Sequence, residues 1–182
     1  TGMSVNFSGA GSVVNTNTIS NITSASAITG LNLGGSNQSI TASQNIIDPI
    51  ASTGGAVIGI VNTTPNTANL TQNTIFSLST TAAAAVTGIS TSGTTANVIK
   101  NKIYDLQSNN ASGTVNGILV SGGTTVTVQN NIIGDLRTPS ANAAIPLAGI
   151  NVTGGTTVNA YYNTVYLNAT SSGALFGSSA IS

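Results

Sequence analysis

The stretch that decides the fold is residues 117–136, which read GILVSGGTTVTVQNNIIGDL. The alternating run at 117–120 predicts a first β-strand, and Ser-Gly-Gly-Thr at 121–124 predicts a turn. The β-branched run at 125–128 predicts a second strand, and residues 132–136 predict a third. Gln129, Asn130 and Asn131 lie between these strands, and we expect them to bend the chain because Asn tolerates the left-handed conformation. Residues 137–148 contain two prolines and are expected to form a loop leading to Gly149.

The same pattern repeats along the chain. An Asn followed two residues later by Ile or Val recurs at intervals of 28, 28, 28, 30 and 32 residues, at Asn17, Asn45, Asn73, Asn101, Asn131 and Asn163. The glycine that opens each copy stands at Gly2, Gly30, Gly59, Gly88, Gly117 and Gly149, and a partial seventh copy starts at residue 180. A period of this length is typical of a solenoid built from stacked supersecondary units. We therefore expect residues 1–182 to form a single repeat array within a longer protein.

Two apolar columns accompany the Asn column. Two residues after the Asn stand Ile19, Ile47, Ile75, Ile103, Ile133 and Val165, and five residues after it stand Ile22, Ile50, Leu78, Leu106 and Leu136, with Asn168 in the last copy. The segment from this second column to the next opening glycine varies from 7 to 12 residues. Strands must stay in register, whereas surface loops can lengthen at small cost, so we expect fixed strands and one elastic loop per repeat.

Three strands per repeat and columns of like residues predict an all-β fold, a parallel β-helix of about six rungs with uncapped ends. Each strand would pair with its counterpart about 4.8 Å away in the next rung, so the stack would rise roughly 25–30 Å. The apolar columns would fill the interior. The Asn column would form a ladder of hydrogen-bonded amides, because buried amides are tolerated only when their hydrogen bonds are made.

The motif Gly-Ile-x-Val, a Gly-rich turn, Thr-Val-x-Val and Asn-x-Ile resembles the right-handed parallel β-helix repeats of the pectate-lyase-like superfamily. Segments such as 120–126 and Tyr162-Asn163-Thr164-Val165-Tyr166 are similar to repeat arrays in large secreted bacterial surface proteins. The resemblance covers nearly the whole chain. It implies a right-handed coil, an Asn ladder between the second and third strands, an extracellular location, and a polysaccharide-binding face beside the elastic loop.

Composition narrows the possible functions. Only 3% of the residues are charged, the net charge is zero, and Glu, His, Cys and Trp are absent. Lys100, Lys102 and Arg137 are the only cations, which argues against nucleic acid as a partner. The apolar runs are too short to insert into a membrane. We expect no cofactor and no metal, because the usual zinc ligands and Cys or His nucleophiles are missing.

Asp105 and Asp135 occupy the same position in adjacent repeats, four residues after the Asn. A carboxylate pair could serve as acid and base in glycoside hydrolysis or help to hold Ca²⁺. Neutralisation of two exposed acids by Lys100, Lys102 and Arg137 is the favoured interpretation. Asp48 is offset by one position and extends the column poorly.

Two further patterns bear on binding. Ice binding would need Thr-x-Thr on one face of successive rungs, and we interpret Thr125 and Thr127 as not recurring in their columns.

Aromatic residues cluster late in the chain, at Tyr161, Tyr162, Tyr166 and Phe176. We expect these residues to pack in the interior or to contact another subunit rather than to stack on sugars.

The sequence favours an extracellular structural repeat protein without enzymatic activity. Its rungs would build a rigid stalk, fibre or surface-layer element, and its partner would be itself, through a longer array or head-to-tail stacking of open ends. The alternative is an adhesin that binds surface glycans through the loop at 137–148. A polysaccharide-active enzyme is the third hypothesis, and ice binding is a minor one.

Overall fold

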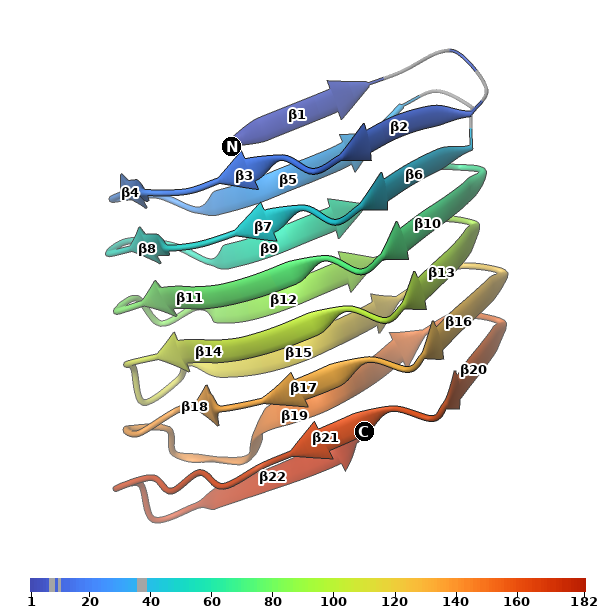
Figure 1. The fold of residues 1–182 in the computed structure, drawn as a ribbon. Helices are drawn as coiled ribbons and strands as arrows, with labels where there is room; N and C mark the ends of the chain where they lie inside the picture. The colour runs from blue at the N-terminus through green and yellow to red at the C-terminus, as the bar shows by residue number, and fades with distance from the viewer. Residues whose placement is uncertain (7–8, 10, 36–38) are drawn as a thin grey trace.

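The computed structural model describes residues 1–6, 9, 11–35 and 39–182, and it confirms the predicted all-β solenoid (Figure 1). Three parallel sheets run the length of the stack. Sheet A contains β1 (Met3–Asn6), β5 (Ile28–Gly34), β9 (Val57–Asn62), β12 (Ala85–Thr91), β15 (Thr114–Ser121), β19 (Ala143–Gly154) and β22 (Phe176–Ile181). Sheet B contains β2 (Ser12–Asn15), β6 (Ile40–Ser43), β10 (Thr67–Thr71), β13 (Thr95–Ile99), β16 (Thr125–Gln129) and β20 (Thr157–Tyr161). Sheet C contains β3 (Thr18–Ile19), β4 (Ile22–Ser24), β7 (Ile46–Ile47), β8 (Ile50–Ser52), β11 (Thr74–Thr80), β14 (Lys102–Ser108), β17 (Ile132–Gly134), β18 (Leu136–Arg137) and β21 (Thr164–Tyr166).

The chain visits sheets A, B and C in turn and then moves one rung along the axis. Viewed from the β1 end, it runs clockwise as it moves away, so the coil is right-handed (Figure 1). Equivalent residues pair in successive rungs, as Ile75 with Ile103 and Ile103 with Ile133. No helix in the described part of the chain is long and apolar enough to cross a membrane.

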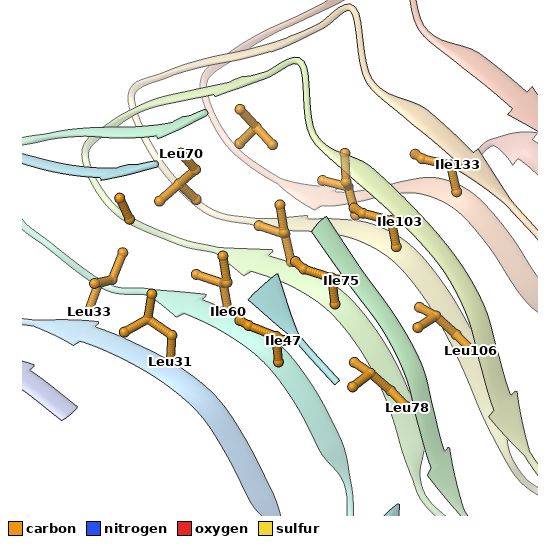
Figure 2. Close-up of a cluster of buried hydrophobic side chains, with 14 of the residues drawn as sticks. Leu31, Leu33, Ile47, Ile60, Leu70, Ile75, Leu78, Ile103, Leu106 and Ile133 are labelled. Carbon is orange, nitrogen blue, oxygen red and sulfur yellow. The ribbon is translucent and has the colours of Figure 1, made fainter. Parts of the chain in front are cut away.

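The apolar columns fill the interior, where Ile75, Ile103 and Ile133 point between the sheets (Figure 2). The Ile and Leu columns are three residues apart, yet both are buried in the rungs from Ile47 and Ile50 to Ile133 and Leu136. Regular strands turn every second side chain inward, so this spacing needs an irregularity. A residue with a left-handed backbone supplies it, for example Asp105 with φ 56° between Ile103 and Leu106. The predicted third strand is therefore kinked, and at Asp135 it divides into β17 and β18.

The corner between sheets B and C also uses one left-handed residue. It lies directly before each ladder Asn, as Thr16, Gln44, Gln72, Lys100, Asn130 and Tyr162, with φ between 54° and 58°. Only one of these six residues is Asn. Such a conformation costs a non-glycine residue roughly 1–2 kcal/mol. The corner therefore forms because the buried columns on both sides of it require the bend, and not because of local propensity.

The opening glycines are needed for close packing against the Ile column. A Cβ on Gly88 would lie 2.6 Å from the carbonyl oxygen of Gly117 and 2.6 Å from Cγ2 of Ile103. Gly59 is similarly placed against Gly88 and Ile75. The glycine and Asn-x-Ile repeats therefore share a cause, because each rung presses its Ile against the glycine backbone of sheet A.

The elastic loop is shorter than the sequence suggested. The expectation that residues 137–148 form a loop is wrong at both ends, because Arg137 belongs to β18 and β19 begins at Ala143. Leu147 is fully buried and pairs with Val115 of the preceding rung. From β5 to β19, each sheet A strand therefore starts two to six residues before its glycine, and the connection between β18 and β19 covers only 138–142.

Candidate functional site

The most regular polar structure is the column of ladder Asn residues between sheets B and C. In the middle of the stack, Nδ2 of Asn73 donates to Oδ1 of Asn101 at 3.0 Å and to the carbonyl of Ala42 at 3.0 Å. Oδ1 of Asn73 accepts from the backbone N–H and from Nδ2 of Asn45, at 3.0 and 2.9 Å. Every hydrogen-bonding position of this buried amide is therefore used, and all four bonds lead to neighbouring rungs.

The ladder continues through the six predicted residues. Asn45, Asn101 and Asn131 repeat the pattern of Asn73 and are buried. Asn17 and Asn163 are half-buried, and their side chains join the ladder through Asn45 and Asn131. The amide-to-amide bonds all run in one direction, since the side chains of Asn17, Asn45, Asn73, Asn101 and Asn131 each donate to the amide oxygen of the next rung. A ladder of this kind polarises its members and fixes the axial register.

A second polar column, which we did not predict, lies at the corner between sheets C and A. Ser52, Thr80 and Ser108 are buried, and their hydroxyls donate to the carbonyls of Ser26, Gly55 and Ala84 at 2.8–3.0 Å. The same oxygens of Ser52 and Thr80 accept backbone N–H groups two residues further on. A sequence signal exists, because a Ser or Thr stands seven residues after every ladder Asn, at Ser24, Ser52, Thr80, Ser108, Thr138 and Thr170. The fifth of these hydroxyls, on Thr138, is buried without a hydrogen-bond partner in the described structure.

A further buried polar group lies between sheets A and B. Asn62 and Thr91 occupy adjacent rungs of a column that is otherwise aliphatic, and Nδ2 of Asn62 donates to Oγ1 of Thr91 at 2.9 Å. Oδ1 of Asn62 accepts from the backbone N–H and the hydroxyl of Thr64. All three residues are buried. Because these hydrogen bonds form only when the two rungs are in register, the group favours one alignment of the rungs.

The carboxylates of Asp105 and Asp135 meet on the outer face of sheet C, where Arg137 lies between them. The guanidinium of Arg137 forms an ion pair with Asp105, and its Nε lies 3.2 Å from Oδ1 of Asp135. Oδ2 of Asp105 also accepts from the hydroxyl of Ser77 at 2.7 Å. Lys102 is placed differently from expectation, because its Nζ lies 4.8 Å from the centre of the Tyr104 ring. Among the described residues, the ion pairs of both acids involve Arg137 and neither lysine.

Asp48 is outside this arrangement, as its offset predicted. Proline fills the equivalent position of its rung, since Leu78 pairs with Ile50 and Pro49 precedes Ile50. Pro49, Ser77, Asp105 and Gln107 line a shallow pocket of about 280 Å³ at the kink of sheet C. The described residues contain no group of three or more possible metal-ligating side chains of the His, Cys, Asp or Glu types.

The late aromatic residues do not all pack inside. Tyr161, Tyr162 and Tyr166 are 41%, 79% and 65% exposed, so of the two expected roles interior packing is excluded for these three residues, and subunit contact stays a prediction. Tyr161 and Tyr162 contact edge to face at 5.7 Å. Phe76 and Tyr104, which we did not predict to interact, stack face to face on sheet C, with ring centres 4.9 Å apart and an interplanar angle of 3°. Their signal was present in the sequence, because both stand three residues after a ladder Asn.

The interpretation that Thr125 does not recur in its column is also wrong. Thr67, Thr95, Thr125 and Thr157 pair in successive rungs of sheet B. The column two residues later contains Asn69, Asn97, Thr127 and Asn159, and Nδ2 of Asn97 donates to Oδ1 of Asn69. The Thr-x-Thr pair therefore occurs in one rung of this group, and Thr-x-Asn in the other three. Sheet B presents one regular Thr column and one mixed amide column.

No family model, curated protein or solved structure matches this chain. The evidence for the parallel β-solenoid is the strand pairing within the structure itself. Conclusions about function therefore depend on the geometry of the rungs and of their outer faces.

Proposed function

We propose that this chain is an extracellular structural element, a rigid spacer whose length is set by the number of stacked rungs. The observation that carries the proposal is the amide ladder, in which each central Asn makes four hydrogen bonds to adjacent rungs. The most regular chemistry in the molecule thus joins rung to rung. A spacer needs this property, since its stiffness depends on contacts along its axis.

The rest of the interior supports the same role. The aliphatic columns and the hydroxyls of Ser52, Thr80 and Ser108 also connect neighbouring rungs. Stacked like residues would repel if they were charged, and the chain has only 3% charged residues. The proposed location at the cell surface, in a pectate-lyase-like array of bacterial origin, draws on the resemblance of the repeats to secreted surface proteins.

The spacer role can be tested by stretching single molecules in an optical trap. The chain has no cysteine, so Thr18→Cys and Thr164→Cys provide unique exposed attachment points in the first and last rungs of sheet C. We expect discrete ruptures at forces that fall when a central ladder Asn is replaced. Gradual extension without discrete ruptures would rule out a load-bearing spacer.

A further inference from the structure

The charged residues of the chain are gathered on or beside sheet C, and half of them are not neutralised there. Arg137 forms ion pairs with Asp105 and Asp135. The other three charged residues have no ion pair in the described structure, namely Asp48, Lys100 and Lys102. The strands of sheets A and B contain no charged residue. One face of a nearly uncharged solenoid therefore presents unpaired charges of both signs.

The same face is uncovered and partly apolar. Sheet C faces the viewer in Figure 1, and no connection of the described chain crosses its outer surface. Ile46 and Ile132 point outward and are 41% and 56% exposed. The stacked rings of Phe76 and Tyr104 are half-buried on this face. Exposed aliphatic and aromatic side chains bordered by charges are typical of a protein–protein contact.

The outward side chains of sheet C form two columns along the axis. From the first rung to the sixth, the first column contains Thr18, Ile46, Thr74, Lys102, Ile132 and Thr164. The second column, two residues further along the chain in each rung, contains Ser20, Asp48, Phe76, Tyr104, Gly134 and Tyr166. The first column reads almost the same in both directions. A twofold axis midway between the third and fourth rungs would therefore bring like residues together.

We propose that two copies of this chain associate side by side through sheet C, with their solenoid axes antiparallel. The twofold axis lies along the strands, between β11 and β14. It keeps each residue at its place along the strand and reverses the order of the rungs, so each column faces itself in the second copy. Ile46 then faces Ile132 of the second copy, and Phe76 faces Tyr104. The apolar side chains of both copies thus cover one another.

The unpaired charges match in the same arrangement. Asp48 faces Gly134 of the second copy, where the column has a gap without a side chain. The ammonium of Lys102 lies 4.8 Å from the centre of the Tyr104 ring. Phe76 stacks on one face of that ring at 4.9 Å, which leaves no room for the ammonium, so Lys102 lies on the face towards Gly134. Each Asp48 carboxylate therefore meets an ammonium in the gap, and symmetry gives two such ion pairs.

Parallel axes would not give this complementarity. A twofold axis along the solenoid would place every rung opposite the same rung of the second copy. Lys100 and Lys102 would then lie level with the same two lysines, and Asp48 would lie level with Asp48. Juxtaposed like charges disfavour a contact, so the charge pattern selects the antiparallel pair.

The size of the face sets the expected affinity. Six rungs span about 24 Å along the axis, and the seven residues of β14 span about 23 Å across it. Each copy would contribute roughly 550 Å², or about 1,100 Å² in total, which is at the lower end for specific interfaces. We expect a dissociation constant on the order of 0.1 mM, so single chains predominate below about 10 μM. The proposal goes beyond the spacer role and does not depend on it.

Sedimentation equilibrium of the whole chain from about 10 to about 500 μM, in about 0.15 M salt, measures the association. We expect the mean mass to rise from that of one chain towards that of two and to stop there, because a twofold contact closes on itself. A chain that stays monomeric at about 500 μM would overturn the proposal. Masses above two chains would indicate end-to-end stacking and contradict a closed pair.

Charge exchange tests the predicted ion pair. Asp48→Lys and Lys102→Asp each bring like charges together and should weaken association by about tenfold or more. The double variant restores opposite charges and should recover most of that loss, whereas damage to the fold would not be reversed. Unchanged association of both folded single variants would overturn the proposal.

Lys100→Asp is the matched control for Lys102→Asp. It changes the net charge equally, but Lys100 lies at the corner outside both columns, and Asp tolerates its left-handed backbone. Because salt screens distant exposed charges, we expect association within about twofold of that of the unchanged chain. An equal loss in Lys100→Asp and Lys102→Asp would contradict the assigned pair.

A nitroxide on Thr164→Cys reports the orientation of the two copies. Thr164 is exposed in the last rung and faces Thr18 of the second copy. Antiparallel axes separate the two labelled backbones by about 26 Å, from five rungs along the axis and one sheet spacing across it, whereas parallel axes bring them to about 10 Å. Double electron–electron resonance at about 0.3 mM should show the longer distance between chains. The shorter distance would overturn the antiparallel pair.

Discussion

Replacement of Asn73 by Ala is expected to lower the free energy of unfolding by about 3–5 kcal/mol. The substitution removes four hydrogen bonds in the middle of the amide ladder. The backbone N–H of Asn45 and one of its side-chain N–H bonds lose their acceptor, and both groups are buried. Each unsatisfied buried group costs roughly 1–3 kcal/mol, so the loss greatly exceeds that of a typical surface substitution.

Urea denaturation monitored by circular dichroism measures this difference. Asn97→Ala is the matched control, because Asn97 is an outward-facing Asn on sheet B whose Nδ2 donates one hydrogen bond of 2.8 Å to Oδ1 of Asn69. We expect that control to cost less than about 1 kcal/mol. Equal stability of the Asn73→Ala and Asn97→Ala variants would show that the ladder does not stabilise the stack.

Insertion of one alanine between Ala96 and Asn97 is expected to cost more than about 5 kcal/mol, comparable with the total stability of a small domain. The insertion falls inside β13, which pairs with β10 and β16 on its two sides. A shift of one residue turns either Ala96 or Val98 outward, and both are now fully buried. The corner between β13 and Asn101 consists of the single residue Lys100, so it cannot absorb the inserted residue.

The same alanine inserted between Ala111 and Ser112 should cost less than about 1 kcal/mol. Both residues are exposed in the connection between β14 and β15, where the repeats differ in length. Circular dichroism and urea denaturation of the two insertions provide the comparison. Similar losses at both sites would contradict the division of each rung into fixed strands and one elastic connection.

The columns could be predicted because each rung buries the same positions. The Asn and the Ile of each Asn-x-Ile motif both point inward, and they are two residues apart just after the corner. This short spacing is visible directly in the sequence. We did not predict the kink at Asp105, because Ile103 and Leu106 look like parts of one regular strand. In a regular strand every second side chain points inward, so two buried residues three positions apart require a kink between them. Five of the six left-handed corner residues are Thr, Gln, Lys or Tyr and only one is Asn, so residue type does not mark them.

The outer faces were harder to predict than the core. The Thr column of sheet B was missed because rung lengths vary, and its alignment depends on counting from the ladder Asn. Counted in this way, Phe76, Tyr104 and Tyr166 also fall at one position in the sequence, and Gly134 marks the gap between them. The partners of Arg137 could not be read from spacing, because a long flexible side chain can reach several neighbours.

The spacing of the rungs is tested most directly by a distance between spin labels on the Thr18→Cys, Thr164→Cys variant. These exposed positions belong to one outward column, five pairing steps apart in sheet C. At the spacing of parallel strands, their backbones should be separated by about 24 Å. Double electron–electron resonance should give one narrow distribution near that value, broadened only by the label tethers. A broad or multimodal distribution, or a mean far from this separation, would contradict a rigid stack of rungs joined by the amide ladder.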